Sequence, residues 1–533
     1  HQLTQLDDNV PLNNNNNSSI NNNSVNNNTP HNLNKSFSSS PSFKYYKGVK
    51  WWKHFTNMSA FAYVVSFITC STLMIILFLS TWIGYRTLHN TKTARQVAIR
   101  RNWLQKTVFL LSIDGFRYDY LRHFSDETPN IHELLMHGVR SEKLIPSFPT
   151  KTFPNHYTLA TGMYPATHGI LNNNMYNEVT RKTFTMSSTE PEWWKGGEPI
   201  WISVEKQNHS ASTIFFPGSN VEIQGKRPSR YQEVYDDEYG DINKINLLMK
   251  YFDEDDKRVK ESAGKKVVDI VNNRTPDRLN LLYVTYFSGV DHEGHAHGPL
   301  STETRMAVRD IDRVIGYLFS ELRKRNVDPF NDVNIVLVSD HGMAELNKEC
   351  ELDIRQIITN QTELEQFRSF YGPYVELTAI DRSSESELIS RVNRAYDQLK
   401  VNEEFVHGGR QYVTYRPEEV PHRLNYHQVA KNFPDICPDI IVSVESHCWM
   451  STFFVPTLLG DHGYDIKHDS MGALFVASGP KIQQSDVPVP PFQNIHLYPL
   501  LAEMMELNRT RLPKIDGALD AVQHVLKQQQ QQH

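Results

Sequence analysis

The sequence predicts an α/β fold in which a central, largely parallel sheet is flanked by helices on both faces and preceded by one transmembrane helix. Four short runs rich in Val, Ile, Leu, Phe and Tyr have the composition of strands that are buried on both faces. Helical patterns occur between such runs, and strand, helix, strand is the order typical of α/β proteins. An uncharged apolar segment upstream is long enough to cross a bilayer.

This apolar segment extends from Phe55 to Tyr85 without a charged residue. A bilayer core requires ~20 such residues, and Trp82 and Tyr85 lie where an aromatic belt would form. A signal peptide would be shorter and closer to the start of the chain. We therefore predict a transmembrane helix over 58–85, which attaches the protein to a membrane.

Low-complexity segments occupy both ends of the chain. Residues 1–57 include "PLNNNNNSSINNNSVNNNTP", which has almost nothing that could form a core, so we predict a disordered Asn/Ser-rich tail. A second, Gln-rich tail is expected over 528–533. Between them we predict a stem over 86–105 and one large domain over 106–527, because no linker-like stretch interrupts the latter.

The orientation of the span is predicted from sequons in the downstream region. Lysine and arginine occur on both sides of the span, so charge asymmetry does not orient the helix. Four Asn-x-Ser/Thr sequons lie downstream, as expected of an extracellular or lumenal domain. We predict a type II membrane protein with a cytosolic tail and with glycosylation at Asn208, Asn273, Asn360 and Asn508.

Charge and cysteine usage limit the possible partners and crosslinks. Charged residues make up 22% of the chain and the formal net charge is -6. Without a basic surplus, we expect no binding to nucleic acid duplexes. Cys70 lies in the span, so Cys350, Cys437 and Cys448 can form at most one internal disulfide. The sequence does not decide which pair forms, and we favour Cys350 with Cys448.

The predicted strands and helices of the large domain are derived from local patterns. The strand-like runs are "TVFLLSIDG" (107–115), "LNLLYVTYFSG" (279–289), "VNIVLVSDHG" (333–342) and "ALFVASGP" (473–480). A helix is predicted over 301–326, with Ser301 as its N-cap, and another over 384–401. In open α/β sheets, ligands bind beyond the carboxyl ends of the strands.

Acidic and imidazole side chains come directly after three of these runs. They are Asp114 after the first, Asp291 and His295 after the second, Asp340 and His341 after the third, and His462 in the later loop "GDHGYD". Carboxylate and imidazole without thiolate are ligands of hydrolytic zinc or of manganese. This set is large enough for two metals, and a pair about 4 Å apart is used in phosphoryl transfer.

A threonine-rich stretch, "PSFPTKTFPNHYTLATG" (146–162), contains candidate nucleophiles without an evident base. It fits no G-x-S-x-G motif. A metal that binds a hydroxyl oxygen lowers the pKa of that hydroxyl, so a threonine beside a metal needs no histidine as base.

Taken in order, these motifs resemble the nucleotide pyrophosphatase/phosphodiesterase family of the alkaline phosphatase superfamily. The matching stretches span roughly 107–480, at spacings compatible with the family. They are "LLSIDGFRYDYL", "PSFPTKTFPNHYTLATGMYPATHGILNNNMY", "EPIWISVEKQ", "FFPGSNVEI", "DHEGHAHGP", "SDHGM" and "GDHGYD" followed by "MGALFVASGP". The resemblance implies an alkaline-phosphatase-like sheet and a phosphodiesterase catalytic domain over 106–527.

The resemblance also implies roles for individual residues. Thr152, and not its neighbour Thr150, occupies the nucleophile position, and Asn173 matches a residue that hydrogen-bonds a phosphate oxygen. Phe153 matches an aromatic that stacks on the nucleobase, opposite Tyr231 or Tyr235. Two zinc ions per subunit would be bound, one by Asp114, Thr152, Asp340 and His341, and the other by Asp291, His295 and His462.

The implied reaction has two steps. Thr152 attacks phosphorus and forms a nucleotidyl-threonine, which water then hydrolyses to a nucleoside 5′-monophosphate. Expected substrates are nucleoside triphosphates, dinucleotides, NAD or nucleotide sugars, and phosphate scavenging is an expected role. We expect His292 and His297 to be exposed or outside the metal site, and His156 and Tyr157 to support the threonine loop. Asp461 is expected to orient a neighbour.

Two other hypotheses are open. The first keeps the metal site but assigns a (lyso)phospholipid or choline-phosphate phosphodiesterase of the same family. The second is a catalytically inactive, membrane-anchored binding protein. The stretches "EPIWISVEKQ" and "FFPGSNVEI" favour nucleotide cleavage, and the presence of every expected ligand residue argues against an inactive site.

Overall fold

The structure, a computed structural model, describes residues 60–262, 278–403, 411–452 and 457–528. The predicted tail over 1–57, residues 529–533 of the second tail, and the sequon at Asn273 lie outside these residues. The chain divides into two compact units, 1–83 and 84–533, which are considered separately.

The centre of the second unit is a six-stranded sheet with the order β2-β17-β8-β1-β7-β6. Its strands β1, β6, β7 and β8 run parallel, whereas β17 runs antiparallel to both of its neighbours. Every residue of the long strand β7 is buried, as its composition predicts. The strands are β1 (Val108–Ile113), β2 (Gly138–Arg140), β6 (Ser210–Ile214), β7 (Asn280–Phe287), β8 (Asn334–Val338) and β17 (Phe475–Ser478).

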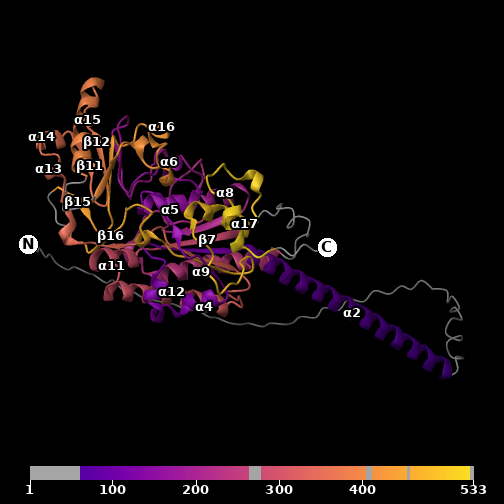
Figure 1. Cartoon of the computed structure of the whole chain (residues 1–533). Coiled ribbons are helices and arrows are strands. Elements are labelled where there is room, and N and C mark those ends of the chain that lie inside the picture. The colour runs from indigo at the N-terminus through magenta and orange to yellow at the C-terminus, as the bar shows by residue number, and fades with distance from the viewer. Residues whose placement is uncertain (1–59, 263–277, 404–410, 453–456, 529–533) are drawn as a thin grey trace, which may run out of the picture. The chain divides into compact units, whose positions relative to one another are not determined.

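Helices cover both faces of this sheet. Figure 1 shows α4, α9 and α12 on one side of β7 and α5, α8 and α17 on the other. The predicted α/β fold is therefore confirmed. These helices are α4 (Pro129–Met136), α5 (Thr152–Thr161), α8 (Ile200–Lys206), α9 (Asp241–Ser262), α12 (Thr302–Lys324) and α17 (Leu497–Met504).

Both helices predicted by pattern are present. In α12 the Ser301 hydroxyl accepts a hydrogen bond from the Thr304 amide at 3.1 Å, which confirms Ser301 as the N-cap. The second predicted helix is α15 (Glu385–Asn402), which begins after Ser384.

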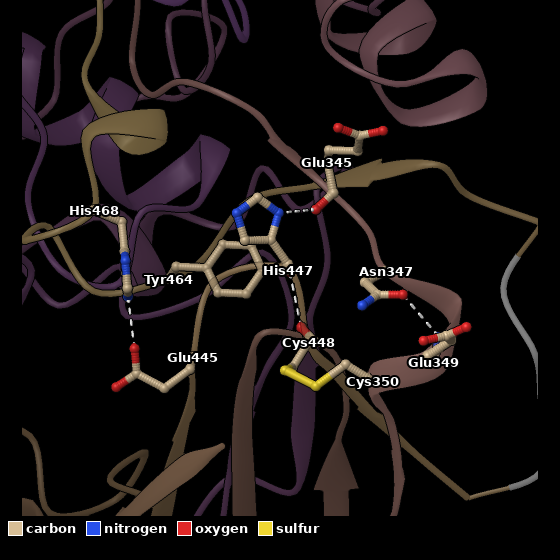
Figure 2. The surroundings of a disulfide bond; sticks show 9 residues. All are labelled: Glu345, Asn347, Glu349, Cys350, Glu445, His447, Cys448, Tyr464 and His468. Atoms are coloured by element: carbon tan, nitrogen blue, oxygen red, sulfur yellow. Dashed lines mark hydrogen bonds and ion pairs between the residues drawn. A yellow bond between two sulfur atoms is a disulfide. The ribbon is translucent and has the colours of Figure 1, made fainter. Parts of the chain in front are cut away.

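A smaller antiparallel sheet, with the order β11-β12-β14-β13, was not predicted. It has its own apolar core, to which α15 contributes. A disulfide joins Cys350 to Cys448 beside this sheet, so the favoured pairing is confirmed (Figure 2). Cys437 is a buried free thiol. The strands are β11 (Phe367–Phe370), β12 (Tyr374–Ala379), β13 (Tyr412–Tyr415) and β14 (Ile440–Val444).

Short helices and paired short strands lie between the elements of these two sheets along the chain. The helices are α3 (Tyr120–His123), α6 (Pro165–His168), α7 (Pro191–Trp194), α11 (Gly289–His297), α13 (Ile354–Ile357), α14 (Gln361–Leu364) and α16 (Val429–Asn432). The paired short strands are β3 (Leu144–Ile145) with β18 (Phe492–Gln493), β4 (Met175–Asn177) with β5 (Lys182–Phe184), β9 (Ala344–Glu345) with β16 (Gly460–Asp461), and β10 (Glu351–Asp353) with β15 (Trp449–Ser451).

The apolar segment forms part of the helix α2 (Ala60–Lys106). Its portion Ala62–Thr87 is long and apolar enough to cross a membrane, and its most hydrophobic stretch is not buried in the protein. The helix continues through the predicted stem over 86–105. Within the second unit, the indole of Trp103 stacks on Phe252 at 5.1 Å and donates to the Asn280 carbonyl at 2.8 Å.

Candidate metal and phosphodiester site

The main sheet and the segments beyond its strand ends bring the predicted Asp and His ligands to one place. Asp114 directly follows β1, and Asp340 and His341 follow β8 after one residue. Asp291 and His295 lie one turn apart on α11, which comes after β7. His462 comes directly after β16. Parallel neighbours end at the same edge of a sheet, so residues that are far apart in sequence meet there.

One part of this cluster consists of Asp291, His295 and His462. The Nε2 atom of His295 lies 3.4 Å from the Asp291 carboxylate, and the Nε2 atom of His462 lies 3.7 Å from it. One ligand atom from each residue falls within 4.8 Å of the others, so the three could hold a metal ion. This is the composition predicted for the second zinc site.

The other part is centred on His341. Its Nε2 atom lies 2.9 Å from Asp340 and 3.4 Å from Asp114. Two overlapping groups could hold a metal here, Asp114 with Asp291 and His341, and Asp114 with His156 and Asp340. The predicted ligands therefore meet, while Asp291 and His156 also lie within reach.

Hydrogen bonds to backbone carbonyls orient the three histidines. The Nδ1 atoms of His295, His341 and His462 lie 2.8 to 2.9 Å from the carbonyl oxygens of Gly460, Gly342 and Thr150. A carbonyl only accepts, so each Nδ1 must carry the proton. Each Nε2 is then free of a proton in the neutral ring and can bind a metal, which is how metal-ligating histidines are usually fixed.

Electrostatics within the cluster show an excess of buried negative charge. Burial, together with Asp340 and Asp291, raises the pKa of Asp114 well above its usual range. Burial opposes ionisation of Asp340 as well, but His341 and His156 outweigh it and hold the pKa of Asp340 well below its usual range. Burial and the neighbouring His341 lower the pKa of His462, which keeps that ring neutral.

A second, independent observation indicates that these carboxylates can bind a metal. One oxygen each of Asp114, Asp291 and Asp340 is buried and has no hydrogen-bond partner among the described residues. A buried oxygen without a partner is costly, and buried charges are normally paired or coordinate metals. A divalent cation would supply the missing partner to all three.

Thr152 is the threonine that faces the cluster. It is the first residue of α5, and its hydroxyl oxygen lies 3.3 Å from the Nε2 atom of His341. The hydroxyl of Thr150 instead donates to the Tyr464 carbonyl at 2.8 Å and accepts from the Gly463 amide at 2.9 Å. The structure therefore places Thr152, and not Thr150, within reach of the metal ligands.

A cavity of about 570 Å³ opens beside Thr152 and Asp114. Its wall includes the ring of Phe153, and the Phe153 amide donates to the Asn173 side-chain oxygen at 2.9 Å. Tyr235 lines the same cavity, whereas Tyr231 is not among its described lining residues. Of the two candidate aromatics, the structure thus brings Tyr235 to the site.

Comparison with known proteins agrees with these features. Residues 108–465 match the family described as type I phosphodiesterase / nucleotide pyrophosphatase. The chain belongs to this family. It is 34% identical over 412 residues to an uncharacterised pyrophosphatase/phosphodiesterase of Schizosaccharomyces pombe, a match that covers 76% of this chain and 78% of the relative.

One animal relative is similar over only part of its length. Ectonucleotide pyrophosphatase/phosphodiesterase family member 3 of Bos taurus is 32% identical over 445 residues, which cover 82% of this chain but only 46% of the relative. The chain thus spans about half the length of this relative.

A solved structure is similar over nearly its whole length. It is murine ectonucleotide pyrophosphatase/phosphodiesterase 5, as an inactive variant in complex with AMP. The two chains superimpose with a TM-score of 0.66 at 25% identity, over 79% of this chain and 99% of the murine chain.

In this phosphodiesterase-family chain, Tyr286 is a site residue that sequence analysis missed. Its hydroxyl donates to the Asp114 carboxylate at 2.6 Å. Tyr286 lies in the strand predicted over 279–289, where the sequence pattern indicates only one more buried, largely apolar side chain. The position of the hydroxyl opposite Asp114 is set only by the pairing of β7 with β1.

Three residues expected to lie outside the metal set have different contacts. The Nδ1 atom of His156 lies 2.9 Å from the Thr152 carbonyl and its Nε2 atom 2.9 Å from the Ser112 hydroxyl, so this ring supports the threonine loop. His297 is exposed and pairs with Glu293. Asp461 accepts hydrogen bonds from the Trp449 indole and the His462 amide.

The described sequons are accessible. Asn208, Asn360 and Asn508 are exposed, as N-glycosylation requires.

Proposed function

We propose that this chain is a metal-dependent hydrolase that cleaves nucleotide phosphodiester and pyrophosphate bonds and releases nucleoside 5′-monophosphates. The observation that carries the proposal is the position of Thr152, which adjoins His341 of the metal cluster and lines the same cavity as Phe153. A nucleophile, metal ligands and an aromatic surface therefore share one cavity. The family match and the AMP bound to the murine relative support nucleotide substrates.

Zinc is the metal that best suits these ligands, because they are carboxylates and imidazoles without a thiolate. When bound, zinc would lower the pKa of a ligating hydroxyl or water and neutralise charge on the phosphoryl group. We assign two ions per subunit, one to Asp114, Thr152, Asp340 and His341 and the other to Asp291, His295 and His462.

The chain's own groups would act in two displacements. The Thr152 oxygen attacks phosphorus, and the leaving group departs with the electron pair of the broken P–O bond. Water then cleaves the nucleotidyl-threonine ester and restores the hydroxyl. The Phe153 amide, which donates to the Asn173 side-chain oxygen in the absence of substrate, and the Asn173 side-chain amide would donate to non-bridging phosphate oxygens. The Phe153 ring offers its face to a nucleobase.

The proposed location is based on the span and the sequons. Among the described residues, the apolar helix over Ala62–Thr87 and three exposed sequons support a type II membrane protein whose catalytic domain, residues 106–527, is extracellular or lumenal. Such an enzyme would take part in phosphate scavenging from external nucleotides, a role that rests on family analogy.

A substrate panel tests the proposal. The full chain in detergent micelles is assayed with ATP, a dinucleoside polyphosphate, NAD, a nucleotide sugar and lysophosphatidylcholine. We expect nucleoside 5′-monophosphates from the nucleotides and little turnover of the lipid. A preference for lysophosphatidylcholine would instead assign a phospholipid phosphodiesterase. No turnover of any substrate by metal-loaded protein would assign an inactive binding protein.

A pair of histidine variants tests the metal assignment. His295 and His297 lie on the same helix, but only His295 belongs to the cluster. His295→Gln should lower the zinc content measured by atomic emission and abolish activity, and His297→Gln should leave both unchanged. Exhaustive chelation should inactivate the wild type, and zinc should restore it. Full activity after chelation would refute the metal-dependent mechanism.

A further inference from the structure

We propose that Asp237 is a positioning residue that holds the ring of Tyr235 at the cavity wall, where it can contact a nucleobase. The inference rests on the proposed function, because it assigns a role to a residue that supports the base side of the same cavity. The Tyr235 side chain is on a loop and is 45% exposed, so packing alone covers only part of it.

The ring of Tyr235 packs on two aromatic neighbours. Its edge faces Phe215 at 5.5 Å and Tyr286 at 6.0 Å between ring centroids. Both neighbours line the cavity as well. Because packing covers the ring only in part, its position also depends on what its hydroxyl binds.

The hydroxyl group of Tyr235 is held by Asp237. It donates to one carboxylate oxygen of Asp237 at 2.7 Å, and the Ser288 hydroxyl donates to the same oxygen at 2.9 Å. The Ser288 oxygen also lies 3.2 Å from the Tyr235 oxygen. One carboxylate oxygen therefore ties two hydroxyl groups together, and hydrogen bonds to a charged acceptor are the strong ones.

Ser288 connects this contact to the metal cluster. It is the residue immediately before α11, the helix that carries Asp291 and His295. Asp237 thus links the loop of Tyr235 to the start of the helix that supplies two metal ligands.

The surroundings of Asp237 favour its charged form. The hydrogen bond from Tyr235 lowers the pKa of Asp237, and Ser288, His292 and Lys244 lower it further, against a smaller opposing effect of burial. The Nδ1 atom of His292 lies 3.8 Å from the second carboxylate oxygen. The acceptor is therefore an anion under ordinary conditions.

A neighbouring pair shows that the sequence pattern alone is not sufficient. Tyr231 and Glu233 repeat the spacing of Tyr235 and Asp237, and the Tyr231 hydroxyl donates to Glu233 at 2.8 Å. The Tyr231 ring, however, lies beneath the Arg227 guanidinium and is not among the described cavity-lining residues. Only the second pair combines the hydrogen bond with a ring at the cavity.

The test compares two esters with the same leaving group. The full chain in detergent is assayed with p-nitrophenyl thymidine 5′-monophosphate, which has a base, and with methyl p-nitrophenyl phosphate, which has none. Asp237→Ala should raise KM for the thymidine ester about 5-fold, with kcat nearly unchanged, because base stacking contributes to binding. KM for the methyl ester should not change.

Two controls separate positioning from charge and from folding. Asp236→Asn removes the same charge one residue earlier, where the carboxylate only caps a short helix by accepting from the Glu238 amide, and should leave both KM values unchanged. Tyr235→Phe keeps the ring but loses the hydroxyl and should match Asp237→Ala. The double variant should be no worse than either single one, because the two changes remove one interaction.

Each outcome decides the proposal. An unchanged KM for the thymidine ester in Asp237→Ala, or an equal rise for both esters, overturns the role of Asp237 while leaving the proposed function intact. If the wild type cleaves the methyl ester but not the thymidine ester, the nucleotide function fails, and the inference fails with it.

Discussion

The two sheets of the second unit contribute to the site in different ways. Three strands of the main sheet lead into Asp114, Asp291 and Asp340, so backbone topology places the proposed metal ligands. The small sheet supplies none of them, but the buried Glu376 of β12 interacts with Asn172, the neighbour of Asn173. The main sheet therefore positions the proposed metal ligands, whereas the small sheet contacts the segment next to Asn173.

The largest expected effect is the loss of catalysis when the proposed nucleophile is removed. Thr152→Ala should lower kcat for p-nitrophenyl thymidine 5′-monophosphate by at least about 10⁴-fold, because the nucleophile is lost. Zinc content should remain, since Asp and His ligands are untouched. Thr152→Ser keeps a hydroxyl and should retain part of the activity. Wild-type turnover by the alanine variant would mean that another group attacks phosphorus.

The next effect concerns the stability of the small-sheet region. The Cys350–Cys448 disulfide joins residues separated by 98 positions, and closing a loop of that length stabilises the fold by about 4 kcal/mol. Replacing both cysteines with serine should lower the free energy of unfolding by this order, measured with urea, and leave kcat unchanged. Cys437→Ser, at the buried free thiol, is the control and should cost less. A large fall in kcat would show that the small sheet takes part in the chemistry.

A smaller effect should appear in the pH dependence of stability. Burial raises the pKa of Glu376 from 4.5 to about 7, against hydrogen bonds with Tyr374 and Asn172 that lower it. Between these pH values the folded state binds more protons than the unfolded state, so the free energy of unfolding falls as pH rises. Across this pH window, the free energy of unfolding of the wild type should fall by roughly 3 kcal/mol more than that of Glu376→Gln.

Urea unfolding of both proteins at several pH values measures that difference. If the free energies of unfolding of the two proteins change equally with pH, Glu376 does not titrate in this range. A changed KM in Glu376→Gln would show that the small sheet influences phosphate binding through Asn172.

The smallest effect concerns binding and not chemistry. Phe153→Ala should raise KM for p-nitrophenyl thymidine 5′-monophosphate about 10-fold, since stacking of a base on an aromatic ring is worth about 1–3 kcal/mol. KM for methyl p-nitrophenyl phosphate should rise much less. Equal rises for both esters would contradict a stacking role and would point to a disturbed Thr152.

The sequence predicted most of the metal site because of where the strands end. Strands buried on both faces have an unmistakable composition, and the polar residue that comes after each one, such as Asp114 or Asp340, stands out against it. Asp291 and His295 are four residues apart in the sequence, and the structure places both on the helix α11.

Other features could not be predicted for physical reasons. Apolar composition carries no strand direction, so nothing indicated that β17 runs antiparallel to β8. The short strands of the small sheet gave no clear pattern. Tyr231 and Tyr235 are both tyrosines two residues before an acid, so the choice between them required the cavity.

The position of β17 has a consequence for how the chain assembles. This strand, Phe475–Ser478, lies between β2 and β8, although β2 is made more than three hundred residues earlier. During synthesis, both older strands present unpaired edges until the last part of the chain arrives, and such edges invite aggregation. A chain truncated before β17 would therefore leave β2 and β8 without this partner strand. We expect such a chain to aggregate or to be degraded, and not to form a shorter enzyme.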